Sequence, residues 1–240
     1  MVKWPSGQVI KSGSLDHLVT WSLSHLATDV SLLSRLTRRK LDPDLAARIR
    51  RSFNEAAGDE EHFPSTIDPR IYHVQLILRT FGDLAGKRVL DAGCGKGRFA
   101  RILKERHPAS TVCALDLAEA MLKFVPAGIG TCAGSLVALP FAAASFDAAY
   151  ATESLEHAVE IERAVAELCR VVKPGGRIVV IDKNVEQWGR LETPEWEKWF
   201  GRRELERLLA RHCREVSSEF ISYWEDVKPD GLFLAWIARK

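Results

Sequence analysis

The sequence predicts an α/β fold in which a doubly wound, mostly parallel sheet of seven strands follows an N-terminal helical extension. Three observations lead to this prediction. Short apolar runs alternate with helical patterns from Lys87 onward. A turn with glycines at alternate positions, residues 93–97, separates the first apolar run from a helical pattern. The residues before position 84 have a different periodicity, that of amphipathic helices.

The alternating part begins with five strands and the helices between them. Strands are predicted at 87–93, 110–117, 128–135, 145–154 and 173–182, and helices at 98–107, 118–125 and 162–172. The stretch 183–213 is polar and rich in tryptophan, and it ends in a helix with Leu205, Leu208 and Leu209 on one face. Strands 215–224 and 231–240 are joined by a turn with Pro229, Asp230 and Gly231, so we expect an antiparallel hairpin at the sheet edge.

The first 83 residues form the predicted helical extension. Apolar residues three and four apart indicate one amphipathic helix, namely Leu15, Leu18, Val19, Leu23, Leu26, Val30 and Leu33. A second helix is predicted after Asp42, which can cap it, with Pro43 in the first turn. This segment could be a layer packed on the α/β core, which is the simpler interpretation, or a cap that closes over a ligand site.

Composition limits the class of protein. The chain has 240 residues, a formal net charge of +2, 28% charged and 46% hydrophobic residues, which is typical of a globular α/β domain without an overall nucleic-acid or membrane bias. No signal-peptide core and no run of about 18 apolar residues is present, so we expect a cytoplasmic protein without a transmembrane segment. Five scattered cysteines predict reduced thiols, and the dispersed histidines predict no metal site.

The glycine turn carries the functional signal. Glycine allows positive φ and close approach to the backbone, and the turn delivers a helix N-terminus to an anionic or polar ligand group. The dinucleotide spacing Gly-x-Gly-x-x-Gly fails here because Arg98 stands at the third position, which disfavours a nicotinamide dehydrogenase. The spacing that is present is Asp91-x-Gly93-x-Gly95-x-Gly97.

That spacing resembles the first motif of class I S-adenosylmethionine-dependent methyltransferases. "DLAEAML" from Asp116 resembles their second motif, residues 133–158 are similar to the branch that includes ubiquinone and menaquinone biosynthesis enzymes, and "CRVVKPGGRIVVID" resembles their shared helix, turn and fifth strand. The resemblance implies a Rossmann-like methyltransferase domain over 84–240, with residues 1–83 as the helical cap. It also implies S-adenosylmethionine as cofactor, held by Asp91, Gly93, Cys94, Gly95, Gly97, Asp116, Leu117, Met121, Ser135 and Leu136.

Individual roles follow from the same resemblance. Asp116 would bind the ribose hydroxyls, Leu117 would lie against adenine, and Met121 would pack beneath it. Ser135 stands where the family usually has an acidic residue, which leaves the contact to the adenine amino group weaker or dependent on backbone amides. Lys96, inside the glycine turn, could approach the methionine carboxylate of the cofactor or point to solvent.

Glu153 and His157, after the fourth predicted strand, are the candidate catalytic residues. They lie four apart, on one face if the segment is helical, and His157 could act as a general base. The alternative is a histidine hydrogen-bonded to Glu153 for structure alone. The residues "ATES" at this place argue against the branch that methylates amino groups of bases or amides, which has Asn/Asp-Pro-Pro-Tyr there. Trp188, Trp196 and Trp199 could wall an acceptor site or pack on the core.

The sequence therefore predicts methyl transfer to a small-molecule acceptor, with nucleic acid an improbable partner and a homodimer compatible with the chain. A methyltransferase acting on RNA or protein is an alternative, because Arg35–Arg51 is basic, although solvated helix faces commonly look alike. An S-adenosylmethionine-binding protein without catalysis is a second alternative. The sequence identifies neither the acceptor nor the atom that would be methylated.

Overall fold

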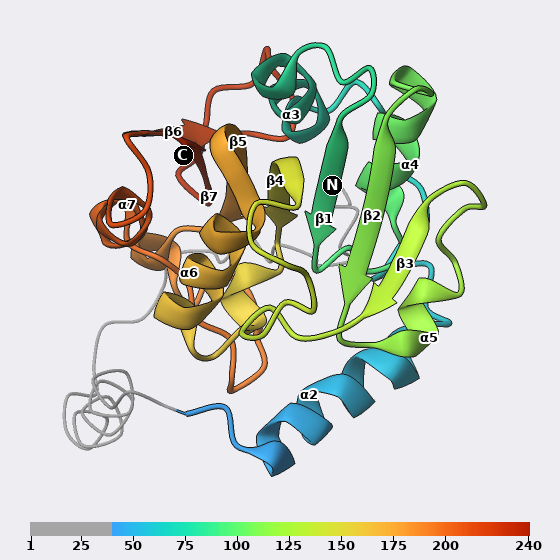
Figure 1. The fold of residues 1–240 in the computed structure, drawn as a ribbon. Coiled ribbons are helices and arrows are strands. Elements are labelled where there is room, and N and C mark those ends of the chain that lie inside the picture. The colour runs from blue at the N-terminus through green and yellow to red at the C-terminus, as the bar shows by residue number, and fades with distance from the viewer. Residues whose placement is uncertain (1–39) are drawn as a thin grey trace, which may run out of the picture.

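The computed structural model describes residues 40–240, which form a seven-stranded sheet with helices on both faces (Figure 1). The strands are β1 (Arg88–Ala92), β2 (Thr111–Asp116), β3 (Gly130–Ala133), β4 (Phe146–Thr152), β5 (Val172–Lys183), β6 (Glu215–Ile221) and β7 (Phe233–Arg239). Their order across the sheet is β3-β2-β1-β4-β5-β7-β6. The predicted doubly wound α/β fold is confirmed. The helix predicted over residues 15–33 lies outside the described residues.

The first five strands pair in parallel, and β7 pairs antiparallel with both β5 and β6. The predicted C-terminal hairpin is therefore present at the sheet edge, and its second strand is the one inserted next to β5. The sheet order changes direction between β1 and β4. In open α/β sheets such a switch point leaves a crevice at the carboxyl ends of the two strands.

Alternate residues of the strands face two separate cores. On one face, Leu90 and Leu115 pack with α6 (Ile161–Val171) and α7 (Arg202–Ala210). On the other face, Val89 and Val112 pack with α3 (Tyr72–Phe81) and α4 (Arg98–Arg106). This alternation is why the central strands are apolar throughout, as expected of a parallel sheet covered on both faces.

Helix α2 (Pro43–Ala56) starts as the sequence predicts. The Asp42 side chain accepts a hydrogen bond from the amide of Leu45 at 2.8 Å, and Pro43 is the first helical residue. The helix contacts α5 (Glu119–Leu122), where the Asn54 side-chain oxygen accepts from the amide of Ala120 at 2.9 Å. Figure 1 shows α2 beneath the arrowheads of β1 and β2, across the carboxyl ends of the strands.

Two further predictions concern the whole chain. All five cysteines are free thiols, three buried and two half-buried. Within residues 40–240, the helices are too short or too polar to traverse a lipid bilayer.

Candidate functional site

A cavity of about 410 Å³ lies at the carboxyl ends of β1, β2, β4 and β5. The glycine turn 93–97 and the ends of β2 and β4 form one side of it. Helix α2, the turn 59–64 and the loop 192–197 form the opposite side. The crevice expected at the sheet's switch point is thus covered by segments that precede β1 and by the loop that follows β5.

The glycine turn needs glycine for two different reasons. Gly93 has φ 79°, and a Cβ there would lie 2.4 Å from the Cβ of Ser154, so no side chain fits. Gly95 has φ 53° with open space where a side chain would be, and Gly97 has φ 74° and caps α4. The Ser154 hydroxyl donates to the carbonyl oxygen of Ala92 at 2.8 Å, which joins the segment after β4 to the end of β1, directly before the turn. The backbone of the turn is therefore accessible at Gly95, whereas at Gly93 it packs closely against Ser154.

Asp116 lies at the end of β2 and lines the cavity. Its two carboxylate oxygens accept hydrogen bonds from the amides of Gly95 and Ala118, each at 2.8 Å. Burial raises the pKa of Asp116, and these backbone amides act in the opposite direction. The carboxylate is thereby held in one orientation beside the glycine turn, with lone pairs left for a ligand.

Five other predicted cofactor residues also line the cavity: Cys94, Leu117, Met121, Ser135 and Leu136. Burial raises the pKa of the Cys94 thiol, so this residue is a neutral apolar wall rather than a nucleophile. The Ser135 hydroxyl accepts from the amide of Val137 at 3.4 Å. The side of the cavity next to the end of β2 is consequently mostly apolar.

Two predicted site residues are not part of the cavity lining, Asp91 and Gly97. Asp91 is 1% exposed and lies beneath the glycine turn beside Tyr150. Burial raises the pKa of Asp91 to about 7, while the Tyr150 hydroxyl acts to lower it. At Gly97 a Cβ would lie 3.0 Å from the side chain of Val125. Asp91 thus lies beneath the turn and Gly97 ends it against Val125, and from these positions both residues can shape the turn.

Lys96 lines the cavity, and its position contradicts one of the two sequence-based alternatives, that of a side chain pointing to solvent. Its ammonium donates to the Asp59 carbonyl at 3.1 Å and to the Glu60 carboxylate at 2.7 Å, and it lies 4.6 Å from the centre of the Phe124 ring. The side chain is 1% exposed, so it does not point to solvent. It joins the glycine turn to the segment that follows α2. A long-range contact of this kind has no local sequence signal.

Glu153 and His157 both line the cavity, but not on a common helical face. Strand β4 ends at Thr152, and η1 (Leu155–His157) is only one turn of 3₁₀ helix. Glu153 has φ 49°, which is strained for a side-chain-bearing residue, and it pairs with Arg98 at 3.2 Å. Burial alone would raise the pKa of Glu153, but the charges of Arg98 and Lys183 outweigh it and lower the pKa. The expected hydrogen bond from His157 to Glu153 is thus replaced by other partners.

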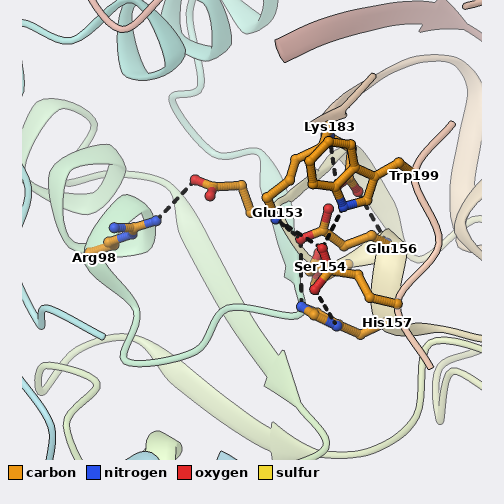
Figure 2. Close-up of polar contacts among 10 residues, drawn as sticks. Arg98, Glu153, Ser154, Glu156, His157, Lys183 and Trp199 are labelled. Carbon is orange, nitrogen blue, oxygen red and sulfur yellow. Dashed lines mark hydrogen bonds and ion pairs between the residues drawn. The ribbon is translucent and has the colours of Figure 1, made fainter. Parts of the chain in front are cut away.

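His157 lies between two carboxylates (Figure 2). Its Nε2 is 3.6 Å from Glu156 Oε1, and its Nδ1 is 3.8 Å from Glu197 Oε2. The Phe53 ring of α2 stands edge-on to the imidazole with centroids 5.0 Å apart. Burial lowers the pKa of His157 to about 4, a change that Lys183 reinforces and that Glu156 and Glu153 oppose. The imidazole is therefore neutral at pH 7, and burial opposes its protonation.

Lys183 at the end of β5 holds these carboxylates together. Its ammonium bonds Glu156 (Figure 2). It also lies 3.3 Å from Glu197 Oε1, which accepts from the Trp199 indole N–H at 2.6 Å. Burial alone would lower the pKa of Lys183, but the carboxylates raise it. Burial and the negative charge of Asp182 raise the pKa of Glu156, and Lys183 acts against this.

The ligating atoms of Glu156, His157 and Glu197 lie within 4.8 Å of one another, a spacing that could hold a metal ion. The Lys183 ammonium already bonds two of these three residues and supplies the positive charge that a cation would bring. The expectation of no metal site remains a prediction.

The three tryptophans after β5 were expected either to wall an acceptor site or to pack on the core, and both arrangements occur. Trp196 lines the cavity, whereas Trp199 is buried in the core and Trp188 packs edge-on against it with centroids 5.3 Å apart. Sequence analysis did not single out the residues that surround His157, which are Phe53, Glu156, Lys183 and Glu197. The one signal in the sequence is the charged pair Asp182–Lys183 at the end of a buried strand.

Comparisons with known proteins agree with this geometry. A family described as "Methyltransferase domain" matches residues 90–180. The chain is 35% identical over 172 residues to a demethylmenaquinone methyltransferase of Renibacterium salmoninarum, covering 68% of this chain and 70% of that protein. It is 37% identical over 97 residues to a malonyl-[acyl-carrier protein] O-methyltransferase of Methylococcus capsulatus, covering 38% and 35% respectively. The chain spans between about a third and three fifths of several curated relatives, namely 35, 49 and 58%.

Solved structures show the same fold. An S-adenosylmethionine-dependent methyltransferase from Mesorhizobium loti is similar with a TM-score of 0.60 at 21% identity, covering 70% of this chain and 97% of the other. A geranyl diphosphate C-methyltransferase from Streptomyces coelicolor, solved with S-adenosyl-L-homocysteine, has a TM-score of 0.58 at 17% identity, covering 84% and 98%.

Proposed function

Because this chain belongs to the class I S-adenosylmethionine-dependent methyltransferases and resembles those of quinone biosynthesis, we propose that it methylates a small-molecule acceptor. One observation carries the proposal. The glycine turn and Asp116 share a single cavity with His157, and α2 lies over it. A cavity of about 410 Å³ lies within the usual size range of small-molecule sites, roughly 300–1,000 Å³.

The cofactor would be held by the side of the cavity formed by the glycine turn and the end of β2. The open face of Gly95 and the N-terminus of α4 suit the polar part of S-adenosylmethionine, and the Asp116 carboxylate suits the ribose hydroxyls. Leu117, Met121, Leu136 and Ser135 would surround adenine, with Cys94 in the wall. Asp91 and Gly97 would support the turn from behind.

When bound, S-adenosylmethionine supplies a methyl carbon on a sulfonium, and the carbon–sulfur electron pair remains on sulfur when an acceptor atom bonds that carbon. The protein's largest task is then to hold the acceptor in line, which can lower a barrier by about 7–11 kcal/mol. His157 is the general base in this proposal, since its neutral imidazole can take a proton from the acceptor. Glu153 pairs with Arg98 at the edge of the cavity and would thereby orient Arg98 next to the glycine turn.

Residues 1–83 and 84–240 are proposed as cap and methyltransferase domain. Support comes from α2, whose Ile49, Ser52, Phe53 and Ala56 line the cavity. The described part of the basic stretch includes Arg48, which forms an ion pair with Glu195 in the loop 192–197, on the same side of the cavity as α2. That contact favours a covering role for α2 over nucleic-acid binding.

The test has two steps. Calorimetry with S-adenosylhomocysteine measures cofactor-product binding, and incubation with methyl-labelled S-adenosylmethionine and a cell extract, followed by separation by size, locates the label. We expect binding and label in the small-molecule fraction. Label retained on RNA or protein would instead favour a macromolecular acceptor, and binding without any labelled product would indicate a protein without catalysis.

A further inference from the structure

The acceptor side of the cavity, which comprises α2, residues 59–64, η1 and the loop 192–197, is rich in aromatic rings. Phe53, Phe63 and Trp196 line it. The Phe53 ring stands edge-on to Phe63 with centroids 5.9 Å apart and edge-on to His157 with centroids 5.0 Å apart. Such a wall offers an apolar surface to a flat molecule and one polar group, the imidazole, at its edge.

The positively charged groups of this cavity are paired with protein carboxylates. Among residues 40–240, every ammonium or guanidinium that lines the cavity bonds a carboxylate. Lys96 bonds Glu60, Arg98 pairs with Glu153, and Lys183 bonds both Glu156 and Glu197. The described lining therefore offers an anionic group no cation that is free of a protein carboxylate.

Carboxyl groups also outnumber the cationic groups around the cavity. Asp59, Glu192 and Glu197 all lie on the acceptor side. A carboxylate or phosphate placed there would have to displace one of these groups from its partner or stay unpaired in a poorly solvated site. Both are unfavourable, because like-charge contacts and buried unpaired ions weaken binding. The charge distribution therefore disfavours an anionic acceptor.

Glu197 stands at the centre of this arrangement. Its Oε1 is fixed by the Trp199 indole at 2.6 Å and by Lys183 at 3.3 Å, which leaves Oε2 facing His157 Nδ1 at 3.8 Å. The side chain is 4% exposed. Glu197 can therefore set the orientation of the imidazole and contribute negative charge to the wall at the same time.

We infer that the acceptor is an uncharged hydroxyl compound with a flat apolar body, and that Glu197 is the positioning and specificity residue that excludes anionic acceptors. The inference rests on the proposed methyl transfer and adds the class of acceptor. The hydroxyl oxygen gains the methyl carbon and loses its proton to the His157 imidazole, and the resulting imidazolium later releases that proton to water. No other reactant is needed.

A matched pair of ligands tests this directly. The probes are 2-naphthol, uncharged at pH 7, and 2-naphthoate, which has the same ring system and is an anion. Calorimetry on the full chain saturated with S-adenosylhomocysteine should show 2-naphthol binding about 10-fold tighter or more, as expected for one disfavoured like-charge contact. Equal affinities, a preference for 2-naphthoate, or failure of 2-naphthol to bind would each overturn the inference.

The variant Glu197→Gln tests whether Glu197 causes the preference for 2-naphthol over 2-naphthoate. It should narrow the ratio of the two affinities by about 3-fold or more, because one negative charge is removed from the wall. The control Glu215→Gln removes a carboxylate on β6, outside the cavity, and should leave the ratio unchanged. An unchanged ratio of the two affinities in a folded Glu197→Gln protein would show that Glu197 is not the specificity residue. The comparison of the two ligands on the unaltered protein does not depend on the folding of any variant.

The inference can fail separately from the proposed function. A protein that does not bind S-adenosylhomocysteine contradicts the proposed function itself. A protein that binds it and prefers 2-naphthoate contradicts only the class of acceptor.

Discussion

At the scale of single residues, the site depends on side chains whose partners fix their direction. Asp116 is held by the amides of Gly95 and Ala118, and Glu197 is held by Trp199 and Lys183. Each of these carboxylates keeps lone pairs for a further donor. Preorganisation of this kind reduces the reorganisation needed when a ligand binds, so single substitutions here should change binding more than folding.

The first prediction concerns Asp116. Asp116→Asn keeps the size of the side chain but removes its charge, and the new amide N–H₂ group faces backbone N–H donors. Affinity for S-adenosylhomocysteine should fall about 10- to 100-fold, the usual range for a lost hydrogen bond to a charged group. Calorimetry measures this. Asp147→Asn removes a carboxylate that bonds Arg88 and Lys173 outside the cavity, and it should leave the affinity unchanged. Equal affinities of wild type and Asp116→Asn would refute the ribose assignment.

The second prediction concerns the charge beside His157. Lys183 lowers the pKa of this imidazole, whereas Glu156 and Glu153 raise it, so Lys183→Met should raise the pKa from about 4. The base must be neutral to accept a proton, and the acidic limb of the pH–rate profile should therefore move to higher pH. NMR titration of the imidazole protons gives the same pKa without turnover. The control Lys183→Arg keeps the positive charge and should leave the pH–rate profile unchanged. Identical profiles for the Lys183→Met and Lys183→Arg variants would show that the charge of Lys183 does not affect the pKa of His157.

At the scale of elements, the short irregular segments after the strands determine where the side chains of the site lie more than the long helices and strands do. Strand β4 stops at Thr152, and the positive φ of Glu153 directs its side chain to Arg98 instead of His157. The one-turn η1 then presents His157 to Phe53 of α2. Helix α2 bonds α5 through Asn54, and Lys96 bonds Asp59 and Glu60 in the segment that directly follows α2.

A third prediction belongs to this scale. Lys96→Met removes the hydrogen bonds from the glycine turn to Asp59 and Glu60, so α2 should open more often. Amides of residues 43–56 should exchange hydrogen roughly 5-fold faster, which corresponds to about 1 kcal/mol for a partly exposed ionic contact. Lys104→Met removes an ammonium that bonds the carbonyls of Pro108 and Ser110 instead, and it should not affect α2. Exchange in α2 that matches wild type would exclude Lys96 as the link.

At the scale of the whole molecule, the sheet order determines where the cavity can form. The order reverses between β1 and β4, and the helices of the two cores leave a cavity at the carboxyl ends of these strands, which only the N-terminus of α4 borders among α3, α4, α6 and α7. The core itself contains a titratable group, His73, which is fully buried between Tyr223 and Phe233 with ring centroids at 4.8 and 5.2 Å. Folding therefore depends on the protonation of a residue outside the cavity lining.

The fourth prediction follows from His73. Burial lowers its pKa in the folded chain to about 4 from an ordinary value of 6.5, so the unfolded chain binds the proton first as the pH falls. The free energy of unfolding should decrease from pH 6.5 to 4, and His73→Leu should make this decrease smaller. Asp91, with a pKa raised to about 7, acts with the opposite sign, so the informative quantity is the difference between wild type and variant in urea unfolding. Parallel pH dependences would contradict the assignment.

The sequence by itself determined the order of the strands along the chain, the glycine turn, Asp116 at the end of β2 and the start of α2 at Asp42. These features are local, because periodicity, capping residues and glycine spacing act over a few neighbouring positions. Tertiary structure alone decided which side chains meet. Lys183 reaches Glu156 across 27 positions and Lys96 reaches Asp59 across 37, while Asp91 lies beneath the glycine turn and Gly97 packs against Val125, so neither of these two residues lines the cavity. Such contacts arise from how packed elements turn toward each other, and single-chain patterns do not encode those orientations.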